Sequence, residues 1–320
     1  MRQDSTVATA TAAAHLSGLL GRRATLLGAT SVGVLAGLSS AAWITMRRQA
    51  DVVTRVIETA ALEMALAQNQ IDPGVTDPTQ LRPPHGDGVY LPDGTRIEAA
   101  PGHHPLTLVM LGDSTSVGYG TKATEELPGV MLAQGAAASL GRPVRLISHG
   151  LIGSGAADLP RQITEALPDA PDVVVINTGG NDVRDTIPPQ RSAAQLGAAV
   201  AVLRAQRIPV VVGTCPDFGV ISPIPQPLRS LVATWSRRLA VMQAKAVTEA
   251  DGVAIPIGRL VSPQFLGRPD LFAPDHFHPS GLGYMRAVAA LQPAVNEALW
   301  DAVAADGGTG QRAAASSTAS

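Results

Sequence analysis

Short apolar runs alternate with longer stretches of helical periodicity over the last two thirds of the chain. The runs lie at 106–111, 144–147, 173–176, 209–212 and 253–255. Helical stretches separate them near 124–140, 156–167, 191–206 and 227–250, and a last helix is expected from about 280 to 302. Continuous β-rich runs separated by helices are typical of a parallel sheet that is covered on both faces. The pattern predicts an α/β domain over residues 105–302, with a five-stranded parallel sheet in a three-layer α/β/α, flavodoxin-like arrangement.

The N-terminal part has a different pattern. Residues 24–46 carry no charge, and a pair of arginines flanks them on each side. A helix of this length spans a hydrocarbon core about 30 Å thick, so we expect a single-pass membrane anchor that follows a polar segment, residues 1–23. A cleaved signal peptide is an alternative, because residues 39–42 are small enough for cleavage, and a buried Ala/Gly-rich helix is another. The expected location is the cell membrane or an extracytoplasmic compartment.

Residues 47–104 connect the expected anchor to the domain. Residues 49–70 have helical periodicity, whereas residues 71–104 are rich in Pro, Gly and Asp. We therefore expect a juxtamembrane helix followed by an extended linker. Apolar residues such as Tyr90 and Ile97 could let part of this linker pack on the domain.

Composition narrows the function classes. The formal net charge is −2, which gives no support to a nucleic-acid partner. The single cysteine, Cys215, excludes a disulfide within the chain. Residues 303–320 are small and polar, so we expect a disordered tail.

Residues that can perform chemistry follow the apolar runs. Ser114 comes just after the first run, Gly153 after the second and Asn181 after the third, while Asp275 and His278 precede the last helix. In a sheet of this type, ligands bind at the carboxyl ends of the strands. A serine needs a neighbouring base, the base needs an acceptor that orients it, and a tetrahedral intermediate needs hydrogen-bond donors for its oxyanion. These residue types together favour ester hydrolysis.

Four short motifs carry a resemblance to a known family. They are GDS at 112–114, Gly153, GGND at 179–182 and DHFH at 275–278. In this order they resemble blocks I, II, III and V of the SGNH (GDSL-type) hydrolases, and the similarity covers roughly residues 106–300. The first block reads GDST where the namesake has GDSL, at a position that carries no catalytic atom.

The resemblance implies a serine esterase or lipase that acts on carboxyl esters without a cofactor or a metal. It implies Ser114 as the nucleophile, His278 as the general base and Asp275 as the residue that orients His278. The implied oxyanion donors are the backbone N–H groups of Ser114 and Gly153 and the side-chain amide of Asn181. Acyl lipids, acetylated glycans and small acyl esters are all plausible substrates.

Other interpretations stay open at this point. An acyltransferase that transfers the acyl group to a glycan or lipid hydroxyl would use the same triad, and a non-catalytic binding module would need a damaged one. Each motif also has a purely structural interpretation as a turn, a bend or a helix cap.

Several residues near the motifs have competing interpretations. His276 and His278 could suggest a metal pair, but no further ligand cluster is visible. His149 could contact substrate or solvent, and Cys215 fits a small buried hydrophobe better than a catalytic thiol. We expect the loops at 183–191 and 217–227 to select the substrate, and the apolar second loop hints at an apolar acyl group.

Overall fold

The computed structural model describes residues 44–52, 55, 59, 86–98 and 105–317, with side chains described as far as residue 304 in the last helix. The chain divides into two units, residues 1–52 and 53–320. Residues 44–52 of the first unit are helical. The second unit contains the sheet and every predicted site residue.

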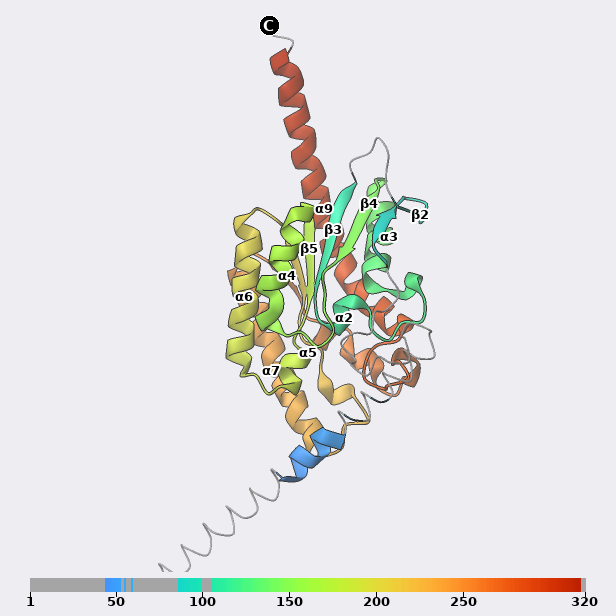
Figure 1. The fold of residues 1–320 in the computed structure, drawn as a ribbon, viewed down its shortest axis with the longest axis vertical. Helices are drawn as coiled ribbons and strands as arrows, with labels where there is room; N and C mark the ends of the chain where they lie inside the picture. The colour runs from blue at the N-terminus through green and yellow to red at the C-terminus, as the bar shows by residue number, and fades with distance from the viewer. Residues whose placement is uncertain (1–43, 53–54, 56–58, 60–85, 99–104, 318–320) are drawn as a thin grey trace, which may run out of the picture. The chain divides into compact units, whose positions relative to one another are not determined.

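Five parallel strands form the larger part of the sheet (Figure 1). They are β3 (Leu106–Gly112), β4 (Val144–Ser148), β5 (Val173–Asn177), β6 (Val210–Gly213) and β7 (Val253–Ile255). Their spatial order is β4-β3-β5-β6-β7. This is the order of a flavodoxin-like sheet, in which the first strand lies between the second and the third. All five predicted strands are therefore present.

Two further strands make the sheet mixed and seven-stranded, which corrects the prediction of a purely parallel five-stranded sheet. β1 (Gly88–Tyr90) pairs antiparallel with β4, and β2 (Arg96–Ile97) pairs antiparallel with β1. Both lie within the predicted linker 71–104, so part of that segment belongs to the domain. Tyr90 is buried in the core, and its hydroxyl donates to the Gly86 carbonyl at 2.6 Å. Strands of three and two residues are too short to show a periodicity, and they form because β4 pairs with β1 and β1 pairs with β2.

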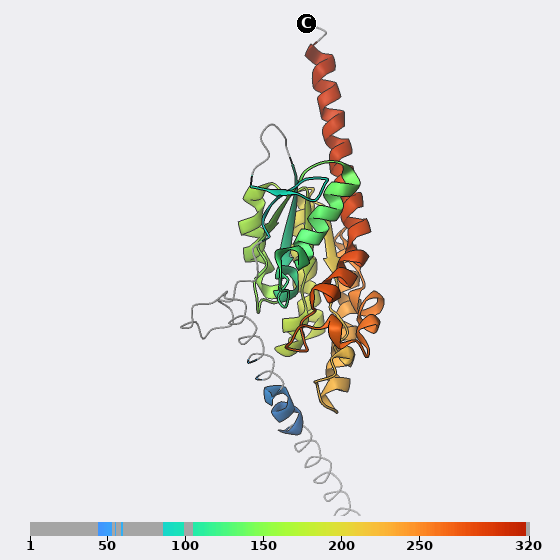
Figure 2. The ribbon, with the colours of Figure 1, turned by 90° about the vertical axis from the view of Figure 1, so that its right-hand side faces the viewer.

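Helices cover both faces of the sheet (Figures 1 and 2). α3 and α9 lie side by side on one face, while α4, α6 and α7 cover the other. Their bounds are Pro128–Leu140 for α3, Leu159–Ala166 for α4, Pro189–Ala205 for α6, Leu228–Glu249 for α7 and Gly281–Ser317 for α9. The predicted three layers are thus present.

β3 shows why its run is almost entirely apolar, with Thr107 as the polar exception. All seven of its residues are buried. Leu108 and Met110 pack in the cluster under α3 and α9, whereas Val109 and Leu111 pack in the cluster under α4 and α6. A strand that is buried on both faces has no polar side.

Short helices occupy the loops at both ends of the sheet. The α-helices among them are α2 (Ser114–Val117), α5 (Gly180–Arg184) and α8 (Ile257–Leu260). The 3-10 helices are η2 (Thr124–Glu126), η3 (Ala156–Asp158), η4 (Leu167–Asp169), η5 (Phe218–Val220), η6 (Ser262–Phe265) and η7 (Pro269–Leu271). α2, α5 and η5 each follow a parallel strand.

The ends of the chain bear on two predictions. α9 continues to Ser317, beyond residue 302, where the sequence predicted a disordered tail over 303–320 to begin. The alanines of this segment have the highest helix propensity of any residue. The predicted anchor, residues 24–46, lies outside the described residues except for 44–46. A search of the described part of the chain finds no helix that is both long and apolar enough for a membrane span.

Candidate active site

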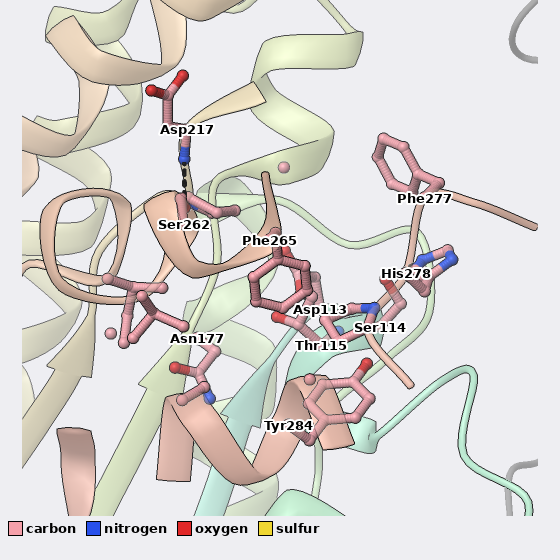
Figure 3. Close-up of a pocket in the computed structure, with 18 of the residues that line it drawn as sticks. Asp113, Ser114, Thr115, Asn177, Asp217, Ser262, Phe265, Phe277, His278 and Tyr284 are labelled. Atoms are coloured by element: carbon pink, nitrogen blue, oxygen red, sulfur yellow. Dashed lines mark hydrogen bonds between the residues drawn. The ribbon is translucent and has the colours of Figure 1, made fainter. Parts of the chain in front are cut away.

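The predicted site residues come from four loops, three of which follow the carboxyl ends of the parallel strands β3, β4 and β5. Ser114 is the first residue of α2, directly after β3, and Asn181 lies in α5, after β5. Asp275 and His278 lie in the loop that precedes α9. Ser114 and His278 line the same cavity (Figure 3). The topology therefore brings together residues that are 164 positions apart.

A chain of hydrogen bonds joins three of these side chains. Ser114 Oγ lies 3.0 Å from His278 Nε2, and His278 Nδ1 lies 2.6 Å from Asp275 Oδ2. Ser114 and His278 are each 8% exposed, so both still reach the surface of the cavity, whereas Asp275 is 2% exposed. These distances and this order are those of a nucleophile, its base and the acceptor that orients the base.

Asp275 is held as a carboxylate. Burial by itself would raise its pKa, but the hydrogen bond and the charge of His278 and two backbone N–H groups outweigh it, so the pKa is lowered below 3.8. Those N–H groups belong to Phe277 and His278, and both donate to Asp275 Oδ1 at 2.9 Å. An ionised Asp275 accepts from Nδ1 of His278. Nε2 of His278 is then the acceptor that faces Ser114.

The turn between β3 and α2 presents Ser114 to the cavity. Gly112 has φ +121°, and a Cβ at this position would lie 1.9 Å from the Asn177 carbonyl oxygen, so only glycine fits. Asp113 caps α2, because its Oδ1 accepts from Thr115 N at 2.8 Å and from Thr115 Oγ1 at 2.6 Å. The tight turn and the cap together fix the first residue of the helix, Ser114.

A buried glutamine that the sequence analysis missed holds this turn to the next loop. Gln162 of α4 is fully buried, and its Oε1 accepts from Gly112 N at 2.7 Å. Its Nε2 donates to Gly112 O at 3.0 Å and lies 3.2 Å from Ser154 Oγ. Ser154 Oγ also donates to Gly112 O, at 2.8 Å. Gln162 therefore ties the residues next to Ser114 and Gly153, a role that its place in an ordinary helical pattern did not indicate.

The two predicted oxyanion residues outside the triad are linked through the same loop. Gly153 has φ +84°, and within the described residues its N–H donates to no protein group. Asn181 lines the cavity with Ser114, and its Nδ2 donates to the Ser154 carbonyl at 2.8 Å. A side-chain amide has two N–H bonds, so one fixes its orientation and the other is left for a ligand. Gly153 itself does not line the cavity.

The cavity beside Ser114 has a volume of about 130 Å³ and mainly apolar walls. The predicted loop 217–227 contributes four residues to it, whereas the predicted loop 183–191 contributes none. Other walls, which the sequence did not indicate, come from residues 257–291. The residues that matter most there are Ile257, Val261, Phe265, Phe272, Tyr284, Ala287 and Leu291. In the sequence, only the apolar residues between β7 and the DHFH motif at 275–278 could have indicated part of these walls.

The three residues with competing interpretations, His276, His149 and Cys215, do not line the cavity. His276 is exposed, unlike His278. His149 Nε2 lies 2.6 Å from Asp169 Oδ2, and His149 does not line the cavity. Cys215 is fully buried, and burial raises the pKa of its thiol, which fits the small buried hydrophobe that we expected. The described part of the chain contains no group of three or more side chains suited to hold a metal ion.

Comparison with known proteins places the chain in a family. The family model of the GDSL-like lipase/acylhydrolase family matches residues 110–286, which is more than half of the chain. The chain belongs to the GDSL-like lipase/acylhydrolase family. This confirms the predicted family and the predicted enzyme class, an ester-hydrolysing enzyme.

A mycobacterial relative agrees with this assignment. The GDSL-like esterase Rv1075c of Mycobacterium tuberculosis is 40% identical over 222 residues, which cover 68% of this chain and 71% of that protein. Two solved structures are similar to part of the chain. AlinE4, an SGNH-hydrolase family esterase, is 26% identical over 61% of this chain and 97% of its own, with a TM-score of 0.45. A lipase/acylhydrolase from Enterococcus faecalis is 23% identical over 60% of this chain and 96% of its own, with a TM-score of 0.49.

A first test in this GDSL-like enzyme addresses whether the contacts of Gln162 position the site. Gln162→Met keeps the volume but removes the partner of the Gly112 N–H. A buried donor without a partner costs about 1–3 kcal/mol of the free energy of unfolding. Because Ser114 and Gly153 are then less well positioned, we expect kcat on a short ester to fall about tenfold or more while KM changes little.

The measurement is steady-state kinetics together with denaturant unfolding. Gln206→Met, on the exposed end of α6, is the matched control and should behave like the wild type. A Gln162→Met enzyme with wild-type kcat and stability would show that the glutamine does not position the site.

Proposed function

We propose that this enzyme hydrolyses carboxyl esters through an acyl-enzyme on Ser114, with His278 as the general base and Asp275 as the residue that orients it. The observation that supports this most strongly is the hydrogen-bond chain from Ser114 Oγ through His278 to Asp275, at 3.0 and 2.6 Å. A hydroxyl becomes a competent nucleophile when a positioned base takes its proton. The name of the mycobacterial relative, an esterase, supports the same reaction class.

The proposed reaction has two halves. His278 Nε2 takes the proton of Ser114 as Oγ attacks the ester carbonyl carbon, and His278 then gives this proton to the leaving alcohol. A water molecule next loses a proton to His278 and attacks the acyl-enzyme, which releases a carboxylic acid and restores Ser114. Asp275 stays ionised throughout and stabilises the charge on the His278 ring.

The oxyanion of each tetrahedral intermediate needs donors that are already in place. We propose the N–H groups of Ser114 and Gly153 and the side-chain amide of Asn181. Ser114 starts α2, so its N–H is one of the donors that the helix itself leaves unpaired. The hydrogen bond from Asn181 to the Ser154 carbonyl supports a fixed amide. Fixed donors require no reorganisation when charge develops.

We also propose that residues 24–46 anchor the enzyme in a membrane. The support is the sequence: the segment is uncharged, long enough to span and flanked by arginine pairs. An anchored enzyme would act at the membrane or on substrates beside it.

The first test of this function addresses the nucleophile. A fluorophosphonate should label Ser114, and Ser114→Ala should lose both the label and nearly all esterase activity while it stays folded. The residual rate should reflect only binding and the oxyanion donors. Peptide mass spectrometry locates the adduct, with Ser116→Ala as the control that keeps the label. An adduct on Ser116 or Ser154 would refute the assignment.

The second test addresses Asn181. Asn181→Ala should lower kcat by about a hundred- to a thousandfold, as the loss of one oxyanion donor typically does. KM should move little, because the donor acts mainly on charge that is present in the transition state. Slow fluorophosphonate labelling should persist, since the contact of Ser114 with His278 remains. Asn181→Asp should be worse, because it places negative charge beside the oxyanion.

The alternative for Asn181 is a purely structural role. In that case Asn181→Ala would cost on the order of 1 kcal/mol of stability through its lost hydrogen bond, and kcat would stay within about threefold of the wild type, far less than an oxyanion donor contributes. Steady-state kinetics and thermal melts of both variants distinguish the two roles.

The third test addresses the anchor. The full-length protein should resist carbonate extraction from membranes, and a chain that starts near residue 72 should be soluble and active, because the described domain begins after that point. A full-length protein that carbonate releases, or a mature N-terminus near residue 42, would favour a cleaved signal peptide.

A further inference from the structure

We infer that the cavity under Ser114 is an acyl-chain site of defined depth, which holds a linear chain of about four to six carbons. The inference rests on the proposed esterase function and adds the substrate class. Ser114 and His278 line this cavity together with residues of α8, η6 and α9, which none of the sequence motifs includes. Figure 3 shows Phe265, Tyr284 and Asn177 around the same space as Ser114.

Apolar side chains from three segments form the walls. α9 contributes Tyr284, Ala287 and Leu291. Phe265 of η6 belongs to the neighbouring cluster of buried apolar residues, on which Ile257 of α8 and Ala287 pack. A mainly apolar surface that begins at a reactive serine suits the hydrocarbon part of an ester, because burial of each methylene contributes to binding.

The floor of the cavity is the carboxyl end of the sheet. Asn177 ends β5 and Gly213 ends β6, and both line the cavity. A Cβ on Gly213 would lie 2.2 Å from Asn177 Oδ1, so the glycine leaves room for the Asn177 side chain beside the cavity. The ends of β5 and β6 therefore close the cavity on this side.

Contacts across the cavity hold its walls at a fixed separation. The backbone N–H of Asp217 donates to Ser262 Oγ at 3.0 Å, which ties the loop after β6 to η6 (Figure 3). The rings of Phe218 and Phe277 meet edge to face with centroids 5.6 Å apart, which ties η5 to the loop that carries His278. A space enclosed by linked walls discriminates chain lengths better than an open groove.

The volume of the cavity limits the length of the acyl chain that it can hold. A protein cavity of about 150 Å³ with apolar walls holds a benzene molecule, which has six carbons. The present cavity, at about 130 Å³, is slightly smaller. It accommodates a butyryl or hexanoyl chain, whereas a dodecanoyl chain has to leave part of its length outside.

The order of events in the reaction assigns the acyl group to this space. The alcohol leaves after the first half-reaction, and a water molecule must then reach His278. The acyl group stays bonded to Ser114 during this exchange, so a cavity that is lined by Ser114 can hold its chain through both half-reactions.

The test is a chain-length series of p-nitrophenyl esters: acetate, butyrate, hexanoate, octanoate and dodecanoate. For the wild type, kcat/KM should rise by up to about fourfold for each added methylene as far as hexanoate. It should level off or fall for longer chains. A profile that is flat from acetate to dodecanoate, or that rises to dodecanoate, would overturn the inference.

Two variants should move the optimum in opposite directions. Ala287→Leu adds three carbons to the wall, so kcat/KM for hexanoate should fall about tenfold or more while that for acetate stays within about threefold. Phe265→Leu enlarges the space and should move the optimum toward octanoate. Ala289→Leu makes the same exchange as Ala287→Leu at an exposed position of α9 that does not line the cavity, and it should keep the wild-type profile.

The outcomes separate this inference from the function on which it rests. Folded variants that label with a fluorophosphonate and hydrolyse acetate, but keep the wild-type profile, overturn the acyl site and leave the esterase function intact. A wild-type enzyme that hydrolyses no ester of the series contradicts the proposed function and with it the acyl site.

Discussion

The site depends on the backbone N–H and the carbonyl group of Gly112. β3 is buried on both faces, and it must end in a turn without leaving buried polar groups unpaired, because each such group costs stability. Gly112 N donates to Gln162, and Gly112 O accepts from Leu151 N, Ser154 Oγ and Gln162 Nε2. The bonds that satisfy these two groups also connect the loop of Ser114 with the loop of Gly153. Core stability and catalytic geometry therefore rest on the same contacts.

Two buried carboxyl groups near Gly112, those of Asp113 and Asp275, have different roles because their hydrogen-bond partners differ. Burial raises the pKa of Asp113 more than its hydrogen bonds with Thr115 lower it. Burial also acts on Asp275, but the charge of His278 and three hydrogen bonds lower its pKa overall. Asp275 is thus kept charged against His278, whereas Asp113 shapes the turn that carries Ser114. The same residue type accepts a hydrogen bond from His278 in one place and caps a helix in the other.

The site joins a polar edge to an apolar interior. The hydrogen-bonding groups stand where the parallel strands end, which is where ligands bind in this fold. The apolar wall comes from α8, η6 and α9, which cover one side of the same edge. An ester needs both surfaces at once, since its carbonyl requires donors and its chain requires burial. The loop that carries Asp275 and His278 leads directly into α9, so one segment supplies part of each surface.

Local patterns in the sequence determined the five parallel strands, the helices between them and the residues at the strand ends. A run of apolar residues or a motif such as GGND at 179–182 can be read without knowledge of its partners. The family resemblance, in turn, named the residues that we propose as nucleophile, base and oxyanion donors. Only the tertiary structure decided the rest. β1 pairs with the edge of β4 and β2 pairs with β1, and the hydrogen bond between Gln162 and Gly112 joins residues 50 positions apart. The apolar wall looks like an ordinary helix face until the sheet edge lies opposite it, since the energy of such contacts depends on neighbours that are distant in sequence.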